Sequence, residues 1–382
     1  MHGMDANVLK GETMTPNEQA TGGMLRRVQA LPTSGARAAE IFADHGATFL
    51  AIPQLAYDVP DAAAHMNGGD SDTELLILRW DGTEFMESVR LPAPGGEDAE
   101  HFIIDGTAYI ATASARSGKG PYEPNIVSTI YRQGADGWEV FQQIPTFFAK
   151  QWRHFTIDGR HFLALAQGVT IETAVPTNPR ASAIYVWNEG RFEPFQVIEG
   201  LWGYNFHHFE VNDRHFLAYA DHVGPSGLLA WTGSGFEPFQ TFSDKGGRAF
   251  TTMWIDGQLQ LAFANIHGPS VVYRWDGASF AELQQFSGSG GREFAYRVIG
   301  GIPYLVLVNF IEGTPQAPRT DLLSHIYSWT GDTWSLVESF PTFGATDAAF
   351  FESSGDLYLV VTNSLTTNVR FRQDAIVYAV DI

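Results

Sequence analysis

The sequence predicts an all-β fold: a seven-bladed β-propeller made of four-stranded antiparallel blades. Three observations predict it. One unit recurs along the chain, each unit holds four short strand patterns separated by turn signals, and the two ends of the chain match neighbouring parts of that unit. Four antiparallel strands that recur about every 40–50 residues are typical of propeller blades. No long segment has the periodicity of an amphipathic helix.

The recurring unit is clearest over residues 129–166. An apolar Ile-Tyr strand leads through a glycine turn to a strand of the form aromatic-x-x-aromatic-Gln, and strands ending in Ile-Asp-Gly and His-Phe-Leu-Ala follow. The first aromatic residue after the glycine turn marks each copy, 44 to 54 residues apart: Phe85, Trp138, Phe192, Phe236, Phe280 and Trp334. We attribute the longer spacings to loop insertions. Because these aromatic anchors lie on strands, we expect them in the sheet core.

Asp-Gly pairs mark the turns between strands of one unit. A type I′ turn requires positive φ at both central residues, so Asp-Gly between apolar runs favours a β-hairpin. The pairs are Asp81-Gly82, Asp105-Gly106, Asp136-Gly137, Asp158-Gly159, Asp256-Gly257 and Asp276-Gly277.

The two ends of the chain together supply one blade. Residues 375–382 match the apolar Ile-Tyr strand, but no strand follows them, and residues 25–33 match the missing outer strand. We therefore expect six complete blades and a split seventh with strands near 348–352, 356–361, 375–380 and 25–30. Pairing the two ends closes the ring and leaves no open sheet edge. The alternative is an open solenoid of antiparallel sheets.

The chain divides into a flexible N-terminal tail, residues 1–24, and a propeller, residues 25–382. The tail lacks the positive and apolar regions of a secretory signal, so we expect a cytoplasmic protein and leave secretion open. No stretch approaches the roughly 18 consecutive apolar residues of a membrane span.

Composition and missing motifs exclude several classes of function. The chain has no cysteine, which rules out disulfides, thiolate metal sites and cysteine nucleophiles. Its net charge of −20 argues against nucleic acid as a partner, because phosphates require a basic surface. The sequence contains no nucleophile elbow, phosphate-binding glycine loop or His-Glu-x-x-His motif.

At its repeated motifs the chain resembles the EAR, or EPTP (epitempin), repeat of the leucine-rich glioma-inactivated proteins. The matching residues are Ile130-Tyr131, Trp138, Phe141-Gln142, Ile144-Pro145-Thr146, Phe155-Thr156-Ile157-Asp158-Gly159 and His161-Phe162-Leu163-Ala164. The resemblance covers nearly all of residues 25–382 and implies a seven-bladed propeller that acts as a protein-interaction module. The chain lacks the leucine-rich repeats, cysteines and secretion signal of the better-known members. Their neuronal partners are therefore not transferred to it.

One face of the predicted ring carries nearly all the insertions. The loops between second and third strands are long near 54–74, 114–127, 167–181, 309–324 and 362–374, and short near 221–227 and 265–270. In a propeller these loops share a face with the mouth of the central channel, and insertions on one face usually mark the binding face. The alternative is neutral drift of loop length.

Alignment of the first strands places seven residues at one level of the channel: Ala38, Asp98, Gln151, Asn205, Ala249, Glu293 and Asp347. Carboxylate and amide oxygens that converge on an axis are suitable ligands for Ca²⁺. We predict a calcium ion in the central channel, held by Asp98, Asn205, Glu293 and Asp347. The resemblance implies the same, since the related neuronal propellers carry channel acids that can hold a cation. The alternative is a water-filled channel with hydrated carboxylates.

One position earlier, the same alignment gives Arg37, Glu97, Lys150, Tyr204, Arg248, Arg292 and Thr346. Four cations near the channel mouth of an acidic protein suggest that guanidinium groups capture an anionic ligand there. The alternative is that these cations pair with Asp98 and Glu293.

Farther along the first strands lie further polar residues: Glu40, Glu100, Arg153 and His207, then His101, His154 and His208. Glu100 and Arg153 are expected to pair across neighbouring blades. The histidines are candidates for zinc ligands or general bases, but recurrence at one repeat position favours packing. Asp221, His222 and His267, at the ends of second strands near the loop face, are the better candidates for chemistry.

The leading hypothesis is a noncatalytic binding propeller that recognises a protein or peptide, or a small anionic ligand, through its loop-rich face. The alternative is an enzyme acting on a small secondary metabolite, a lyase, cyclase or hydrolase. Its site would lie at the channel mouth among Arg37, Tyr204, His207, Arg248 and Arg292. Self-association through the loop face is a third possibility. A deep pocket with buried titratable groups would favour the enzyme, and a flat apolar patch would favour protein binding.

Overall fold

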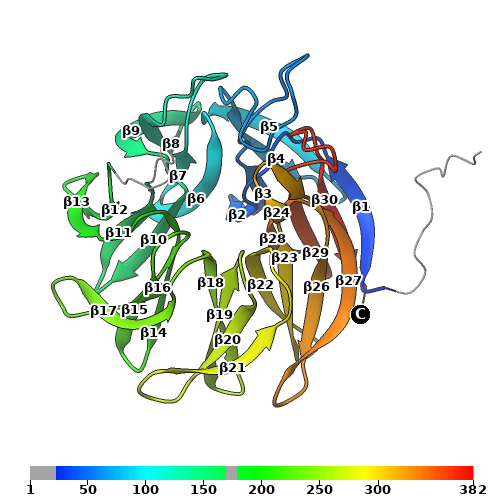
Figure 1. Ribbon diagram of the computed structural model, residues 1–382. Helices are drawn as coiled ribbons and strands as arrows, with labels where there is room; N and C mark the ends of the chain where they lie inside the picture. The colour runs from blue at the N-terminus through cyan, green and yellow to red at the C-terminus, as the bar shows by residue number, and fades with distance from the viewer. Residues whose placement is uncertain (1–22, 169–178, 382) are drawn as a thin grey trace, which may run out of the picture.

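The computed structural model describes residues 23–168 and 179–381, and these form an all-β ring around a central channel (Figure 1). Seven four-stranded antiparallel sheets follow one another around the ring, so the predicted seven-bladed propeller is confirmed. The predicted tail, residues 1–24, lies almost entirely outside the described residues. No helix in the described part of the chain has the length and hydropathy needed to cross a membrane.

The first four blades follow the chain in order. Blade 1 contains β2 (Glu40–Asp44), β3 (Ala47–Ile52), β4 (Glu74–Trp80) and β5 (Phe85–Pro92). Blade 2 contains β6 (Gly96–Ile104), β7 (Thr107–Ser114), β8 (Asn125–Gly134) and β9 (Gly137–Phe147). Blade 3 contains β10 (Gln151–Ile157), β11 (Arg160–Ala166), β12 (Ser182–Asn188) and β13 (Arg191–Ile198). Blade 4 contains β14 (Gly203–Val211), β15 (Arg214–Asp221), β16 (Ser226–Trp231) and β17 (Phe236–Ser243).

The remaining blades include one inserted hairpin and the split blade. Blade 5 contains β18 (Gly247–Ile255), β19 (Gln258–Asn265), β20 (Ser270–Trp275) and β21 (Phe280–Phe286). Blade 6 contains β22 (Gly291–Ile299), β23 (Ile302–Asn309), β26 (Asp321–Trp329) and β27 (Trp334–Phe343), and its loop carries the hairpin of β24 (Glu312–Thr314) and β25 (Ala317–Arg319). Blade 7 contains β28 (Ala345–Ser353), β29 (Asp356–Asn363), β30 (Ala375–Val380) and β1 (Leu25–Leu31).

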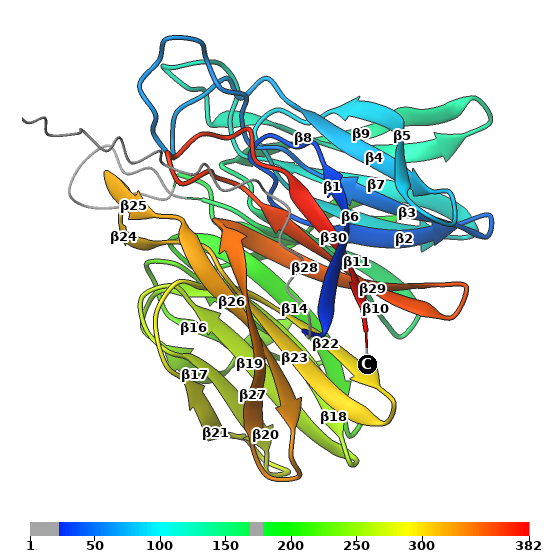
Figure 2. The same ribbon diagram turned by 90° about the vertical axis from the view of Figure 1, so that its right-hand side faces the viewer.

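The N-terminal strand closes the ring as the sequence predicts. β1 pairs antiparallel with β30, from Leu25 opposite Val380 to Leu31 opposite Ala375. Figure 2 shows the two strands side by side, blue beside red, although they come from opposite ends of the chain. Blade 7 is thus completed by hydrogen bonds between the two ends, and the open-solenoid alternative is wrong.

Apolar side chains fill the spaces between neighbouring blades. Five of the aromatic anchors are buried: Phe85, Phe192, Phe236, Phe280 and Trp334. The sixth, Trp138 of blade 2, is half-buried. Phe236, for example, packs with Phe155 and Phe206 from the facing sheets of blades 3 and 4. Large aromatic rings suit these wedge-shaped spaces because each ring buries a large apolar area.

A β-bulge in each outer strand explains the glutamine of the repeat. In β13 the register shifts so that Phe195 is the extra residue, and Gln196 follows it. Gln196 Nε2 donates to the carbonyl of Phe236 at 2.7 Å, and its Oε1 accepts from the N–H of Phe236 at 2.8 Å. The same two bonds join other neighbouring blades: Gln29 with Phe85, Gln142 with Phe192, Gln240 with Phe280 and Gln284 with Trp334. The repeated glutamines therefore join the blades along the outside of the ring.

The hairpin prediction holds in full at some turns and in part at others. Asp105, Asp158 and Asp256 have positive φ, as do the glycines that follow them, which is the type I′ pattern. At Asp81-Gly82, Asp136-Gly137 and Asp276-Gly277 only the glycine has positive φ. The carboxylates of Asp81 and Asp276 instead accept the N–H groups of the residues two and three positions later. Asp81, for example, accepts from Thr83 and Glu84.

Candidate functional site

The loops between second and third strands project from one face of the ring (Figure 2) and surround a cavity at the channel mouth, which we call the cup. The cup has a volume of about 670 Å³. Ligand-binding pockets of proteins span roughly 300–1,000 Å³, so the cup lies within that range. Its wall consists of Arg37, Leu55, Met66, Asn67, Glu97, Arg116, Tyr122, Pro124, Phe148, Lys150, Trp202, Tyr204, His222, Arg248, Ile266, His267, Ser289, Arg292, Phe310, Ile311, Glu312, Gly313 and Pro315.

The long loops of blades 6, 7, 1 and 2 are tied to one another around the cup. Thr320 Oγ1 donates to the carbonyl of Thr366 at 2.9 Å, and Asp58 accepts the N–H of Phe371 at 3.1 Å. Arg116 donates to the carbonyls of Asn67 and Gly68, each at 2.7 Å. These contacts join successive loops into one wall, whereas the loops of blades 4 and 5 span only residues 222–225 and 266–269.

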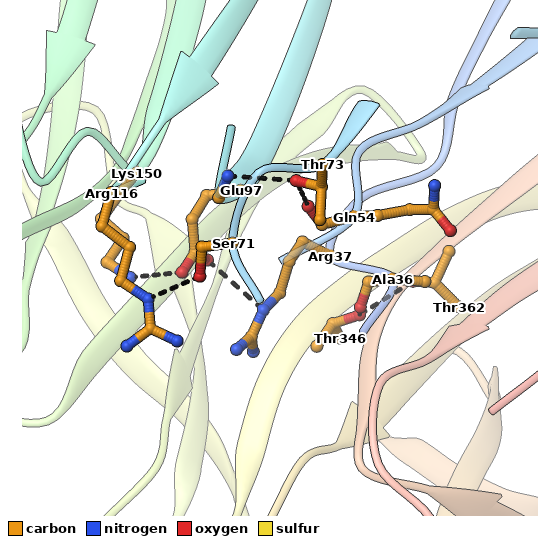
Figure 3. Close-up of polar contacts among 11 residues, drawn as sticks. Ala36, Arg37, Gln54, Ser71, Thr73, Glu97, Arg116, Lys150, Thr346 and Thr362 are labelled. Atoms are coloured by element: carbon orange, nitrogen blue, oxygen red, sulfur yellow. Dashed lines mark hydrogen bonds and ion pairs between the residues drawn. The ribbon is translucent and has the colours of Figure 1, made fainter. Parts of the chain in front are cut away.

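Five cationic side chains line the cup: Arg37, Arg116, Lys150, Arg248 and Arg292. Figure 3 shows Glu97 between two of them, Arg37 and Lys150. Lys150 Nζ is 2.6 Å from Glu97 Oε1, and Arg37 Nε is 3.7 Å from Glu97 Oε2. Burial by itself raises the pKa of the Glu97 carboxyl, but the charges of Lys150 and Arg37 outweigh it and lower that pKa to about 2. Glu97 is therefore ionised, and it neutralises one positive charge of the pair it contacts.

Arg248 is buried without the partners that a guanidinium normally has. Its side chain is only 6% exposed, and its Nε and Nη1 atoms have no hydrogen-bond partner among the described residues. Its Cζ lies 3.9 Å from the centre of the Tyr204 ring, and Arg292 Cζ lies 5.3 Å from the same centre. Burial lowers the pKa of Arg248 to about 10, so the group stays charged at neutral pH. Arg248 forms no ion pair with an acid of the described residues, and a buried charge without a counter-charge in contact is costly, which suits a site completed by an anion.

Tyr204 lies among three cations at the centre of the cup. Burial opposes ionisation of its phenol, but the charges of Arg248, Lys150 and Arg292 outweigh burial and lower its pKa. Lys150 Nζ is 5.2 Å from the centre of the ring, so this cation both lowers the pKa of the phenol and makes a cation–π contact with the ring.

Trp202, His222 and His267 form the side of the cup that blades 4 and 5 supply. The ring of His222 lies 5.0 Å from that of His267 and 5.0 Å from that of Trp202. Trp202 Nε1 and His222 Nδ1 are buried without hydrogen-bond partners among the described residues. Burial lowers the pKa of His222 to about 2, so its ring is neutral. Together with Arg248, these residues leave several polar hydrogens or lone pairs unused in one part of the cup.

Asp221, expected to take part in chemistry, has a structural task. Its carboxylate accepts the N–H groups of Leu201, Trp202, Val223 and Gly224 and the hydroxyl of Tyr219. These bonds hold the two segments that carry Trp202 and His222. Asp221 is fully buried and does not line the cup.

Below the cup lies the level of Ala38, Asp98, Gln151, Asn205, Ala249, Glu293 and Asp347, which we call the belt. All of these residues except Ala249 line a smaller cavity of about 240 Å³. Four of its side chains accept a backbone N–H from the next blade: Asp98 from Trp152 at 2.9 Å, Gln151 from Phe206 at 2.6 Å, Asn205 from Phe250 at 3.1 Å and Asp347 from Ala39 at 2.8 Å. The belt thus joins the first strands around the inside of the ring.

The residues beyond the belt behave as the packing interpretation expects. Arg153 Nη1 lies 3.1 Å from Glu100 Oε2 on the neighbouring blade, which confirms the predicted pair. Glu100 also accepts the N–H of His154 at 2.7 Å. The rings of His101, His154 and His208 stack on phenylalanines of neighbouring blades, with centroids 4.3 to 4.7 Å apart.

With this geometry described, comparison with known proteins identifies the repeat. The model of the EPTP domain matches residues 139–188, 191–232 and 235–276. This chain is a propeller that contains EPTP repeats. Each match begins in the outer strand of one blade and ends in the third strand of the next, and this same offset makes β1 complete blade 7. The predicted membership of the EAR/EPTP repeat propellers is confirmed.

Two relatives of the EPTP propeller carry the same repeat. Over 116 residues it is 33% identical to the thrombospondin-type laminin G domain and EAR repeat-containing protein of Homo sapiens, an alignment that covers 30% of this chain and 15% of that protein. The Mus musculus protein of the same name is 32% identical over 125 residues, covering 32% and 17%. The matched part of the EPTP propeller spans less than a fifth of either relative. The fold and the repeat support a protein-binding propeller in general terms.

The structure brings together most of the residues predicted for ligand binding. Arg37, Tyr204, Arg248 and Arg292 all line the cup, whereas His207 lies deeper, with Nε2 2.9 Å from Thr252 Oγ1. The alternative in which the mouth cations pair with Asp98 and Glu293 is wrong in its partners. Among the described residues, Arg37 and Lys150 pair with Glu97 instead.

The predicted calcium ligands Asp98, Asn205, Glu293 and Asp347 all lie in the belt of the EPTP propeller. Asp98 and Asn205 each use one oxygen on a backbone N–H, and Asp347 uses both, the second on Ala348 at 2.7 Å. Within residues 23–168 and 179–381, no group of three or more His, Asp or Glu side chains is placed to hold a metal ion. The calcium site stays a prediction, for which thermal unfolding with Ca²⁺ and with a chelator is the test.

Sequence reasoning missed Arg116, Trp202 and Phe310 as parts of the cup. Arg116 stacks on Tyr122 at 3.7 Å and donates to Ser71 Oγ at 3.0 Å, so loop contacts aim it into the site. Arg116 and Phe310 follow the second strands of blades 2 and 6, as His222 and His267 follow those of blades 4 and 5. Aligning the residues just after each second strand would have indicated them.

Proposed function

We propose that this EPTP propeller binds a protein or peptide through its loop-rich face and that an anionic group of the partner enters the cup. The observation that carries the proposal is Arg248, buried over Tyr204 with two nitrogens unpartnered among the described residues. A carboxylate or phosphate would supply both the missing counter-charge and the missing acceptors. Arg292, 9% exposed and above the same ring, adds a second guanidinium.

The wall of the cup supports the proposal because it is organised before any partner arrives. The loops of blades 6, 7, 1 and 2 are held by hydrogen bonds such as Phe371 N–H to Asp58 and Arg116 to Gly68. A preformed surface loses little conformational entropy on binding, so more of the contact energy appears as affinity.

A peptide array probed with the fluorescently labelled protein tests the proposal. We expect the bound peptides to be richer in acidic groups than the array as a whole. The double variant Arg248→Gln, Arg292→Gln should lose at least tenfold in affinity for them. Arg274→Gln, an exposed arginine on β20, is the matched control and should bind as the wild type does. Equal binding by the double variant and the wild type would sink the proposal.

The second candidate is an enzyme that acts on a small metabolite in the cup, as a lyase, cyclase or hydrolase. It is favoured by the concave shape of the site and by two titratable rings at its centre. The centroids of Tyr204 and His222 lie 5.6 Å apart, the phenol has a lowered pKa and the imidazole is neutral. Such a pair is suited to proton transfer. Incubation with a metabolite extract, followed by mass spectrometry of wild type and Tyr204→Phe, would detect a product that only the wild type forms.

A further inference from the structure

Most of the unpartnered nitrogens of the cup lie on one side of it, and a group of buried apolar side chains lies on the other. Four residues of the cup have a buried nitrogen without a hydrogen-bond partner among the described residues. Trp202, His222 and Arg248 come from blades 4 and 5, and Arg37 comes from blade 1. Leu55 and Met66, from the loop of blade 1, and Phe310 from blade 6 are buried apolar residues that also line the cavity. In a ring of seven, the junction of blades 4 and 5 lies opposite blade 1. The unused polar groups of blades 4 and 5 and the apolar residues of blade 1 therefore face each other across the cup.

We infer that the cup accepts a carboxylate joined directly to a large apolar group, with the carboxylate toward Arg248 and the apolar group toward Leu55, Met66 and Phe310; this rests on the proposed function. A carboxylate would accept a hydrogen bond from an unpartnered nitrogen of this guanidinium and would supply its counter-charge. Trp202 Nε1 offers a further donor on the same side. Arg37 borders the apolar side chains, since its Cζ lies 5.4 Å from the ring of Phe310.

In a peptide, this chemistry belongs to the C-terminus. The terminal carboxylate is attached to the same carbon as the last side chain, so both fit one cavity. An acidic side chain in mid-sequence would have to bring two passes of backbone into a cup that is walled on the side of blades 6, 7, 1 and 2 by loops joined through hydrogen bonds. A small arylalkanoic acid presents the same two groups without a chain. Both sources share one chemistry and are separated by the experiment.

Isothermal titration calorimetry with five probes tests the inference. The probes are an N-acetylated hexapeptide Gly-Ser-Gly-Ser-Gly-Phe with a free carboxylate, its C-terminal amide, the free acid with a final Gly, N-acetylphenylalanine and phenyl phosphate. We expect the Phe acid to bind at least tenfold more tightly than its amide and than the Gly acid. If N-acetylphenylalanine binds as tightly as the hexapeptide acid, the natural ligand is a small acid. If the hexapeptide acid binds more tightly, the natural ligand is the C-terminus of a peptide chain.

Two variants assign the discrimination to its residues. Arg248→Gln should remove the difference in affinity between the Phe acid and its amide. Met66→Gln should reduce the difference in affinity between the acids that end in Phe and in Gly. Both variants should unfold at the same temperature as the Arg274→Gln control. Equal binding of acid and amide, tighter binding of phenyl phosphate than of the Phe acid, or no binding of any free acid at millimolar concentration overturns the inference. Because the amide comparison changes only the ligand, it stands even where a variant misfolds. If acidic peptides from the array bind through Arg248 and Arg292 while acid and amide ends bind equally, the proposed function stands and this inference fails.

Discussion

The cup and the belt are successive levels of the same first strands, yet their polar groups are satisfied in opposite ways. Asp98, Gln151 and Asn205 in the belt each accept a backbone N–H of the next blade. One residue earlier, Arg248 is buried with two nitrogens that have no partner in the described part of the chain. Satisfied polar groups in the belt hold the ring together, and unsatisfied ones in the cup are available to a ligand. The belt and the cup therefore differ less in charge than in whether their polar groups already have hydrogen-bond partners within the protein.

Removal of β1 should have the largest effect, because both levels depend on a closed ring. A chain that begins at residue 32 lacks the outer strand of blade 7 and the buried Leu31, so β30 becomes an open edge. We expect the cooperative thermal transition to disappear. A synthetic peptide of residues 23–33, added in excess, should restore it. An unchanged transition without the peptide would mean that closure contributes nothing to stability.

Asn205→Ala tests the belt as a structural level. The N–H of Phe250 would lose its acceptor in a buried position, which lowers the free energy of unfolding by about 1–3 kcal/mol. Urea denaturation measures the change, and Asn188→Ala, an exposed asparagine at the end of β12, is the control. A loss no larger than that of the control would remove the distinction between the two levels.

Arg248→Met tests the cup, and its expected effect on the free energy of unfolding is opposite to that of Asn205→Ala. Replacing a buried guanidinium that lacks a counter-charge by an apolar side chain of similar length should raise the free energy of unfolding by about 1–2 kcal/mol while abolishing anion binding. The exposed Arg274→Met is the matched control. If Arg248→Met instead destabilises the protein as Asn205→Ala does, Arg248 is a structural residue and the comparison fails.

The smallest effect is a pH dependence that arises in the belt. Burial raises the pKa of Asp98 to about 7, of Glu293 to about 8 and of Asp347 to about 6. The folded state therefore holds protons that the unfolded state has released, so this stabilisation is complete below the ordinary carboxyl pKa and is lost as pH rises through about 6–8. The buried histidines, whose pKa is lowered, act in the opposite sense only below about pH 6.5.

Urea denaturation between pH 7 and pH 9, in chelator, should show the free energy of unfolding falling as pH rises. Asp98→Asn removes one of the acids and should make the decline shallower. A rise in stability with pH would contradict the burial argument. Calcium that stabilises the wild type at pH 9 but not the Asp98→Asn variant would support the predicted cation site.

Much of the fold and part of the site followed from the repeat alone. A residue at a given place in one blade recurs at the same depth in the next, so alignment placed Arg37, Tyr204, Arg248 and Arg292 at one level, and the cup contains all four. The same alignment placed Glu100 beside Arg153 on the neighbouring blade. His207 was grouped with the residues of the channel mouth for the enzyme site, but it lies three residues after Tyr204 on the same first strand and therefore deeper in the channel.

The sequence by itself determined the number of blades, the closure by β1 and the level at which each channel residue lies, since these follow from repeat spacing and strand alternation. Only the tertiary structure decided which groups are partners. Glu97 forms ion pairs with Lys150 and Arg37 but none with Arg248, and Arg116 is held in the cup by Ser71 of the neighbouring blade's loop. Hydrogen bonds and ion pairs act over about 3–4 Å, a distance that the order of residues along the chain does not specify between blades.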